Sequence, residues 1–207
     1  ILTGWVKRVF IDPEFTFSFI GLDWLQPLPG SGMYWYFVLM GFLGLFIMVG
    51  YRYKFAMITY TLLWAGVYFM QKSSYNNHYY LLLIISFFMI FLPANQYKSL
   101  DVKQNRVIES FFMPNWIRLL FIVQVGIVYV FAASAKLYPD WLDGSFTKNL
   151  LLGTTSNTYF VAVFSQKWFY LFIAYAGIFF DLLIVPLLLY KKTRTFAIVA
   201  SLIFHLF

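Results

Sequence analysis

The chain has 207 residues, of which 62% are hydrophobic and only 11% are charged, and its formal net charge is +7. A composition this apolar, with a mean hydropathy of +0.75, excludes an ordinary soluble domain and indicates an integral membrane protein. The sequence contains no cysteine, which excludes disulfides, thiolate nucleophiles and thiolate metal sites. The positive charge does not indicate a nucleic-acid partner, because the basic residues lie in short loops between apolar runs.

Residues 1–32 are predicted to form an interfacial segment that ends in a breaker. The Asp-Pro-Glu stretch at 12–14 is surrounded by aromatic residues, which is typical of a segment lying at a membrane surface: Trp5, Phe10, Phe15, Phe17 and Phe19. The Pro- and Gly-rich stretch at 27–32 interrupts the chain before the first long apolar run. Because the sequence begins with Ile1 and stops inside an apolar run at Phe207, we expect it to be a piece of a longer protein, truncated at both ends.

Residues 33–207 are predicted to form one all-α transmembrane domain, a polytopic helix bundle. A helix needs roughly 17–25 apolar residues to cross the bilayer core, and several runs in this chain reach or approach that length. We predict spanning or partly spanning helices at Met33–Gly50, Phe55–Gln71, Tyr79–Pro93, Asn115–Ala135, Trp168–Tyr190 and Thr195–Phe207.

The loops between these runs differ in charge when they are assigned alternately to the two sides of the membrane. One side receives Asp101, Glu109 and a larger basic set, Arg52, Lys54, Lys98, Lys103, Arg106, Arg118, Lys191, Lys192 and Arg194. The positive-inside rule places that side in the cytoplasm. His78, Lys136 and His205 then fall on the non-cytoplasmic side of a multi-pass protein, in a bacterial inner membrane or a eukaryotic ER membrane.

Lys136 directly follows the near-uncharged run Asn115–Ala135, which ends in the small residues at 132–135. Small side chains on a membrane helix let a neighbour approach closely or leave room for a bound molecule. One interpretation is a cation that satisfies the last helical carbonyls and extends to water. The other is a general base, because burial disfavours an ammonium, although the helix dipole acts in the opposite direction. The residues leave both interpretations open.

His78 closes a polar stretch, residues 73–78, between two apolar runs. One interpretation is a helix start capped by Asn76 or Asn77. The other is chemical, because a helix N-terminus favours a neutral imidazole that can exchange a hydrogen bond with a substrate oxygen. A metal or haem site is the least favoured, because neither cysteine nor a paired acidic cluster accompanies the histidines, and we predict no metal.

Asp181 is the only carboxylate inside a predicted span. Because such a residue costs roughly 2.5–3.5 kcal/mol on insertion scales, we expect it to face the bundle interior with a partner. A role in proton or substrate transfer and a structural hydrogen bond both remain open for it. Taken alone, His205 is interpreted as a packed polar residue, and Asn95 as a capping or turn residue after Pro93.

Three motifs occur in order: NNHYYL at 76–81, ANQYKSLD at 94–101, and the segment 129–144 with YVFAA, KL and DWLDG. In type, order and spacing they resemble the membrane part, or HTTM domain, of the vitamin K-dependent γ-glutamyl carboxylase family. DWLQPLP at 23–29, Asp181-Leu182 and Phe204-His205 extend the resemblance to about residues 23–205.

The resemblance implies a specific chemistry. In this family, a lysine matching Lys136 deprotonates vitamin K hydroquinone, and reaction with O2 generates a base that removes the γ-proton of a peptide glutamate. CO2 then adds to the carbanion, and the vitamin leaves as its epoxide. The histidine matching His78 assists by hydrogen bonding. Further cofactor-binding or supporting positions are implied at Asn77, Asn95, Trp141, Asp181 and His205.

The implied partners are a glutamate-containing peptide or protein substrate and the lipid bilayer, with vitamin K hydroquinone, O2 and CO2 as cofactors and no metal or nucleic acid. The sequence does not define an oligomeric state. Ala135 and Gln96 stand where animal carboxylases have a lysine and a histidine, and the soluble C-terminal portion of those enzymes is not in this sequence. We therefore expect a bacterial-type relative.

Two other functions stay open. One is a non-catalytic quinone- or lipid-binding membrane module. The other is a transporter that uses Asp181 as its coupling group, which is less favoured because the sequence shows no paired, Gly/Pro-broken helices.

Overall fold

The computed structural model describes residues 4–155 and 157–206, and within them all regular structure is helical. This confirms the predicted all-α fold. The chain contacts divide it into two compact units, residues 1–113 and 114–207, and each is described by itself. The division predicted at residue 32 concerns how the N-terminal segment meets the membrane, and it stays a prediction.

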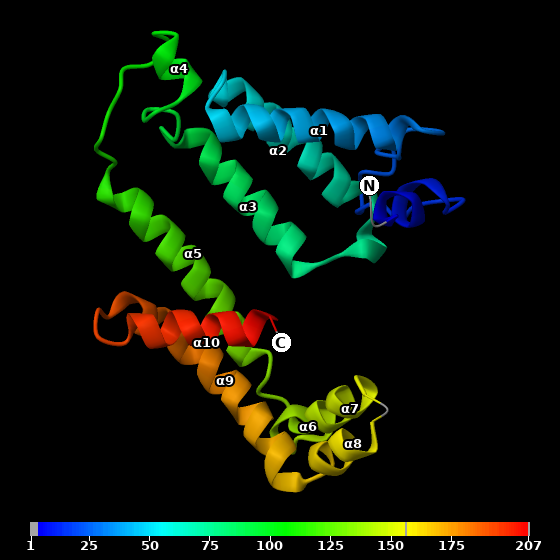
Figure 1. Cartoon of the computed structure of the whole chain (residues 1–207). Helices are drawn as coiled ribbons and strands as arrows, with labels where there is room; N and C mark the ends of the chain where they lie inside the picture. The colour runs from blue at the N-terminus through cyan, green and yellow to red at the C-terminus, as the bar shows by residue number, and fades with distance from the viewer. Residues whose placement is uncertain (1–3, 156, 207) are drawn as a thin grey trace. The chain divides into compact units, whose positions relative to one another are not determined.

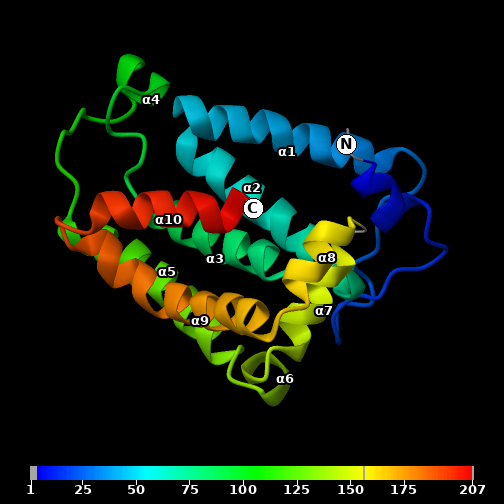
Figure 2. The same ribbon diagram turned by 60° about the horizontal axis from the view of Figure 1, so that its bottom comes forward.

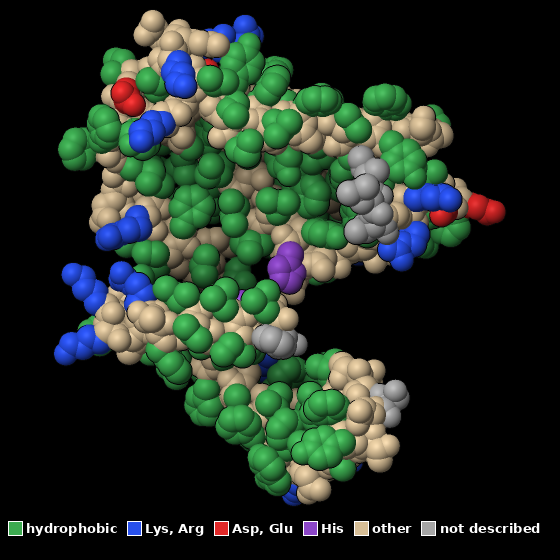
Figure 3. All heavy atoms as spheres, viewed as in Figure 1, with side chains coloured by type: hydrophobic (Ala, Val, Ile, Leu, Met, Phe, Trp, Pro, Cys, Tyr) green, Lys and Arg blue, Asp and Glu red, His purple; other side chains and the backbone are tan. Residues whose placement is uncertain are grey.

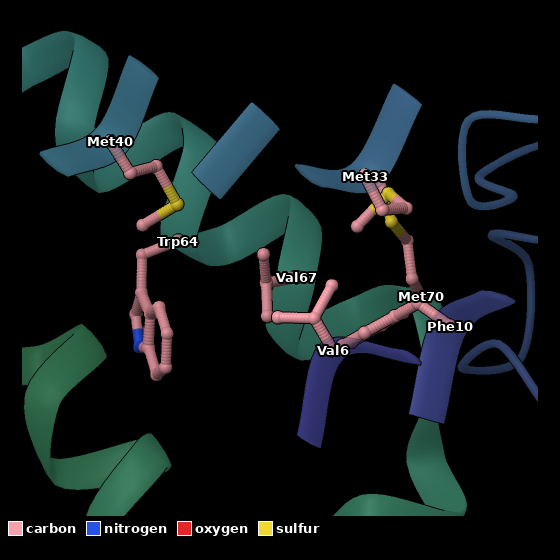
Figure 4. Close-up of a cluster of buried hydrophobic side chains, with 7 residues drawn as sticks. All are labelled: Val6, Phe10, Met33, Met40, Trp64, Val67 and Met70. Carbon is pink, nitrogen blue, oxygen red and sulfur yellow. The ribbon is translucent and has the colours of Figure 1, made fainter. Parts of the chain in front are cut away.

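The first unit is built around α2, which packs against both α1 and α3 (Figure 1). Its helices are η1 (Lys7–Ile11), α1 (Gly32–Val49), α2 (Tyr53–Met70), η2 (Lys72–Ser74), α3 (Asn77–Phe91) and α4 (Leu100–Lys103). The N-terminal segment is attached by Val6 and Phe10, which are buried against α1 and α2 (Figure 4). Burying a side chain of this size from water contributes about 1.5–3 kcal/mol, which is enough to hold the segment in place. The other buried members of this cluster are Met33, Met40, Trp64, Val67 and Met70.

The turn between α1 and α2 requires glycine at position 50. Gly50 ends α1 in the left-handed conformation, with φ +63°, and its N–H bonds to the carbonyls of Phe46 and Ile47. A Cβ at this position would lie 2.5 Å from the Cβ of Ser99, which no real contact allows. The turn therefore brings α2 close to the segment that precedes α4.

The second unit is built around α9, which packs against α5 and α10. Its helices are α5 (Asn115–Ser134), α6 (Pro139–Leu142), α7 (Ser145–Gly153), α8 (Thr158–Phe164), α9 (Lys167–Leu189) and α10 (Arg194–Leu206). The short helices α6, α7 and α8 gather at the beginning of α9 (Figure 2). Near its other end α9 contains Pro186, whose ring nitrogen cannot donate to the carbonyl of Leu182 as a helical N–H would.

In the described part of the chain, α1, α5 and α9 are long and apolar enough to cross a membrane, and α3 and α10 are shorter apolar helices. α2 also has 18 residues, but tyrosines, threonines and Lys54 lower its hydropathy. Figure 3 shows hydrophobic side chains over much of the visible helix surface, with Lys and Arg side chains mostly at the ends of helices and in loops. A water-soluble protein rarely exposes so much contiguous apolar surface. The predicted integral membrane protein is therefore supported, and the six predicted helices agree with the observed ones to within about two residues at each end.

Candidate functional site

Lys136 and Asp181 form an ion pair inside the second unit. The Lys136 Nζ donates to Oδ2 of Asp181. The Asp181 side chain is 3% exposed and that of Lys136 is 18% exposed, so the amine points to a buried carboxylate and not to open water. Asp181 was expected to face the interior with a partner, and Lys136 is that partner.

Local sequence explains how this lysine reaches the middle of α9. The α5 helix ends at Ser134 and is followed by Ala135, so Lys136 leaves a helix end made of small residues. On α9, the facing position is Gly177, where an added Cβ would lie 3.9 Å from Cε of Lys136. The missing side chain leaves the space in which the lysine stem lies. Asp181 follows one turn later on the same face of α9.

Trp141 forms one wall of this site. Its indole Nε1 donates to the backbone carbonyl of Ala174 at 3.0 Å, which fixes the ring against α9. The Lys136 Nζ lies 5.3 Å from the centre of the indole, a cation–π distance. On α7, Phe146 stacks on the indole with ring centroids 5.1 Å apart. Lys136 is thus held between a carboxylate and a flat aromatic surface.

A second polar pair joins α5 to α10. The hydroxyl of Tyr129 on α5 and Nε2 of His205 on α10 are 2.9 Å apart. Phe180, the residue before Asp181, lies 6.1 Å from each of their rings, and it stacks on Phe204 at 3.9 Å. Four of the predicted residues, Lys136, Trp141, Asp181 and His205, therefore belong to one region of the second unit.

His78 and Asn77 lie in the first unit, at the beginning of α3. Asn76 caps this helix, and its Oδ1 accepts from the backbone N of His78 and contacts Nδ1 of the imidazole, both at 2.8 Å. Because an amide oxygen only accepts, Nδ1 carries the proton. A neutral His78 then has Nε2 free of a proton, as an acceptor. Asn77 accepts a hydrogen bond from the hydroxyl of Tyr75, and both His78 and Asn77 are exposed.

Asn95 lies in the connection between α3 and α4, where its side chain is engaged by Asp101. The amide of Asn95 donates to Oδ2 of Asp101 at 2.8 Å. The same carboxylate accepts from the backbone N–H groups of Arg52 at 2.8 Å and Tyr53 at 3.0 Å, at the start of α2, and from Arg106 at 3.4 Å. Burial raises the pKa of Asp101, but these hydrogen bonds outweigh it and hold the pKa below the ordinary value of an aspartate. In this structure, Asn95 serves a buried structural carboxylate.

The sequence analysis assigned no role to two of the residues described above, Tyr129 and Asp101. Tyr129 is only part of the YVFAA motif there, and Asp101 is only an acid in a basic loop. A tyrosine near the end of an uncharged span is a detectable signal, because a phenol in lipid needs a partner. Asp101 has a weaker signal, namely a single acid between the helix-capping Ser99 and several basic residues.

Two concavities lie in the first unit. One of about 410 Å³ lies between the N-terminal segment and the end of α2, lined among others by Glu14, Phe17 and Gln71. Another, of about 240 Å³, lies in the connection from α3 to α5. The described residues also contain no cluster of His, Asp or Glu that would hold a metal ion.

The arrangement in the second unit can hold a proton at a half-buried amine, stabilise the resulting cation with a carboxylate, and offer an aromatic surface to a planar molecule. No solved structure matches the chain. The model of the HTTM domain matches residues 1–207. That match spans the whole sequence and agrees with the motifs at 76–81, 94–101 and 129–144, so this chain belongs to the HTTM domain family.

Proposed function

We propose that this protein is a membrane enzyme that couples oxygenation of vitamin K hydroquinone to γ-carboxylation of a peptide glutamate, with Lys136 as the base. HTTM domains are associated with vitamin K-dependent carboxylase-related membrane proteins. The observation that carries the proposal is the ion pair of Lys136 with buried Asp181, because it is a basic group withdrawn from water beside an aromatic wall.

The residues around Lys136 fit a planar aromatic diol. The indole face of Trp141 and the small Gly177 give a flat surface that a ring can lie against, and the amine is the group that a phenolic hydroxyl would meet. When bound, vitamin K hydroquinone supplies the reaction with O2 and the base strength that the chain itself lacks. Its isoprenoid tail dissolves in lipid, which suits a site within a spanning helix bundle.

Lys136 acts in its amine form by accepting a proton at Nζ, and Asp181 stabilises the ammonium that results. The carboxylate also fixes the direction of the amine, because it accepts the hydrogen bond from Nζ. Trp141 keeps water from one side of Lys136 and adds a cation–π contact to the charged form. Each of these contacts is stronger after proton uptake than before, which is what catalysis requires.

His78 is proposed as the hydrogen-bonding partner of the reacting oxygen. With Nδ1 held by Asn76, its Nε2 accepts a hydrogen bond when the ring is neutral and donates one only as imidazolium. The amides of Asn77 and Asn95 are proposed as supporting groups, through the start of α3 and through Asp101. The excess of basic residues in the other set of loops supports a site on the non-cytoplasmic side of the membrane.

The sharpest test replaces Lys136 with arginine. Arginine keeps a positive charge opposite Asp181, but it does not give up its proton in proteins and so cannot act as a base. The purified full chain in lipid nanodiscs receives reduced vitamin K, O2, labelled bicarbonate and a glutamyl peptide. The parent is expected to yield both epoxide and carboxylated peptide, and Lys136→Arg is expected to lose both by about 10²–10⁴-fold.

Lys148→Arg is the matched control, because Lys148 also lies over an aromatic ring, that of Tyr170 at 6.0 Å. It should leave turnover unchanged. If the parent yields neither product, the proposal is wrong. An active Lys136→Arg variant would remove the base role from this lysine.

A non-catalytic quinone-binding module is the second candidate, and the ion pair itself is the observation that favours it. A lysine already neutralised by a buried carboxylate is a common way to accommodate charges inside a membrane bundle. This function predicts vitamin K binding with the same affinity in the parent and in Lys136→Arg, with no epoxide from either. Transport coupled through Asp181 has less support, because that carboxylate is already paired.

A further inference from the structure

The connection from α3 to α5 carries exposed cations that have no part in the proposed function. Lys98, Lys103 and Arg106 are exposed in it, as is the acid Glu109. In the described part of the chain, Lys98 and Lys103 have no acidic partner, whereas Arg106 pairs with buried Asp101 at 3.4 Å. Figure 3 shows Lys and Arg side chains on the surface around α4, next to hydrophobic ones. This surface therefore keeps an excess of positive charge.

The same connection exposes large apolar side chains on backbone that is not helical. Residues 107–113 form no helix, and in them Ile108 is 89%, Phe111 73% and Phe112 89% exposed. Irregular backbone that faces lipid does not occur inside the hydrocarbon core, because its N–H and C=O groups would lack partners there. These side chains therefore fit the level of the headgroups, from which they reach into the upper acyl region.

Contacts arrange the cationic and apolar side chains in one series. The Lys98 Nζ lies 5.2 Å from the centre of the Tyr97 ring, and that ring lies 5.1 Å from the ring of Phe111. The backbone N–H of Ser110 donates to the carbonyl of Gln96 at 2.8 Å, which joins the two stretches. The apolar end contains the concavity of about 240 Å³, which is lined among others by Tyr97, Phe111, Phe112 and Met113. The surface thus offers an ammonium, then a phenol, then an apolar hollow.

The backbone holds Lys98 in an unusual conformation. Its φ of +46° lies in the left-handed region, which is unfavourable for a residue with a Cβ. The next residue, Ser99, is buried, and its hydroxyl donates to the carbonyl of Asn95 at 2.5 Å and accepts from the N–H of Val102 at 3.1 Å. These two bonds fix the chain beside Lys98, so the ammonium is presented from a rigid turn.

We propose that this surface binds one phospholipid with an anionic headgroup, of which phosphatidylglycerol is the probe. The phosphate lies at the ammonium of Lys98, the glycerol and ester groups meet Tyr97, and the first acyl carbons enter the concavity. Lys103 and Arg106 add positive potential, which favours an anionic headgroup over a zwitterionic one. The connection is also predicted to lie on the cytoplasmic side, whose leaflet carries anionic lipids.

The first test counts bound lipids on the full chain. The protein in a nonionic detergent is titrated with phosphatidylglycerol or phosphatidylcholine and followed by native mass spectrometry. One phosphatidylglycerol should bind roughly tenfold or more tightly than phosphatidylcholine, because several cations face its headgroup. Lys98→Gln should weaken phosphatidylglycerol binding by about fivefold and leave phosphatidylcholine binding unchanged. Lys98→Arg should keep the preference, because it keeps the charge.

Lys148→Gln is the matched control, because the Lys148 ammonium also lies over a tyrosine ring, that of Tyr170 at 6.0 Å. It should leave the binding of both lipids unchanged. A general packing defect in Lys98→Gln would weaken both lipids alike, whereas loss of a headgroup contact removes only the preference for phosphatidylglycerol.

The apolar end separates a bound lipid from a bound phosphate. Phe111→Ala leaves every charge in place and should weaken phosphatidylglycerol binding by about fivefold or more, because the acyl carbons lose a wall of the concavity. Phe87→Ala, at an exposed phenylalanine of α3, is the control and should have no effect. Soluble glycerol phosphate at the same concentration should not displace the lipid, because it has no acyl chain.

A second measurement places the connection in a bilayer. The parent chain has no cysteine, so a single Ile108→Cys or Lys103→Cys variant accepts one nitroxide label. In phosphatidylglycerol-containing vesicles, the label at 108 should relax more with lipid-soluble O2 than with a water-soluble nickel chelate, and the label at 103 should show the reverse. Equal exposure of both labels to the nickel chelate would contradict an interfacial position.

Three results would overturn the lipid site. The first is equal affinity of the parent for the two lipids, and the second is parental phosphatidylglycerol affinity in Lys98→Gln or Phe111→Ala. The third is displacement by glycerol phosphate, which would mean that the phosphate alone is recognised. Neither measurement involves turnover, so the outcome for this site is independent of the role proposed for Lys136.

Discussion

Asp101 connects three parts of the first unit through one carboxylate. Its oxygens accept from the start of α2, from Asn95 and from Arg106, while its backbone N–H donates to the carbonyl of Gly50 at 2.9 Å. The two backbone donors at the start of α2 would otherwise lack a partner, as the first N–H groups of every helix do. This carboxylate therefore acts as a cap for a helix that is distant in sequence.

Asp101→Asn should destabilise the first unit by roughly 1–3 kcal/mol, because an amide NH₂ would face donors where the carboxylate oxygen now accepts. Thermal unfolding of the full chain in detergent, followed by circular dichroism, measures the change. Asp140→Asn, at an exposed position on α6, is the control and should leave the unfolding temperature close to that of the parent. An equal effect of both substitutions would contradict the special role of Asp101.

The same carboxylate predicts a pH dependence. The pKa of Asp101 lies below its ordinary value, while an unfolded aspartate has a pKa of about 3.9. A lowered pKa stabilises the fold fully above the unfolded value, and the stabilisation is lost as the pH falls through the folded value. The difference in unfolding temperature between the parent and Asp101→Asn should therefore be constant above about pH 5 and should shrink below about pH 4. A difference that grows on acidification would disprove the assignment.

At the level of residues, the sequence identifies candidate site residues more reliably than it identifies the residues with which they interact. Asp181 stands out because an acid inside a span needs compensation. Its partner, Lys136, is 45 positions away and depends on how α5 and α9 pack, which apolar periodicity does not encode. Asn95 is a second example. Its role as a capping or turn residue is predicted from the neighbouring sequence, but its hydrogen bond to Asp101 depends on the α1–α2 turn.

At the level of helices, the close contact of α5, α6 and α9 depends on Gly177. An added Cβ would lie 3.7 Å from Trp141 and 3.9 Å from Lys136, which is ordinary van der Waals contact. Gly177→Ala should therefore preserve the ion pair and turnover. Gly177→Leu should displace Trp141 or Lys136 and reduce turnover by about tenfold or more, since small misplacements of a catalytic group are costly.

Helix content by circular dichroism separates the two expected effects of Gly177→Leu. Helicity should stay close to that of the parent, because α9 is already apolar around this position and leucine is a good helix former. Loss of turnover with intact helicity supports the packing argument. If Gly177→Ala also loses turnover, α9 does not tolerate even a methyl group at this position. That result would contradict the packing argument, because the space between Gly177, Trp141 and Lys136 is wide enough for a Cβ.

The long helices were predictable, whereas the short ones were not. Long apolar runs with few charges indicate membrane helices from composition alone, because roughly 17–25 such residues cross the bilayer core. The helices α4, α6, α7 and α8 have 4 to 9 residues, and they depend on capping and on contact with longer helices. The position of Trp141 against Ala174 depends on these short helices. The sequence therefore identified Trp141 as a site residue but did not predict where its ring lies.

At the level of the whole molecule, the absence of cysteine makes sidedness directly testable. Single cysteines at Lys103 and Lys192 should react with a membrane-impermeant thiol reagent only from the cytoplasmic face, since both lie in the more basic loops. Cysteines at Lys72 and Lys148 should react only from the opposite face. Right-side-out and inverted vesicles give the measurement, with the cysteine-free parent as the background control. Labelling of all four positions from one face would overturn the predicted topology.

Family membership is also a property of the whole chain. The order of three short motifs along the whole chain predicted the HTTM domain, and the match over residues 1–207 confirms it. No single motif would have been sufficient, because each is only six to sixteen residues long. The chemistry of the family is carried by particular residues, and for this chain it remains a proposal.

Pro186 adds a further element to the region around Asp181. Because a proline supplies no N–H, the carbonyl oxygen of Leu182 lacks its usual helical donor, one residue after the buried acid. Inside a bilayer such an oxygen is costly unless something donates to it, and the smallest available donor is water. A missing helical hydrogen bond that would merely weaken a soluble protein would, in this bundle, favour a bound water molecule within the apolar interior, one turn from Asp181.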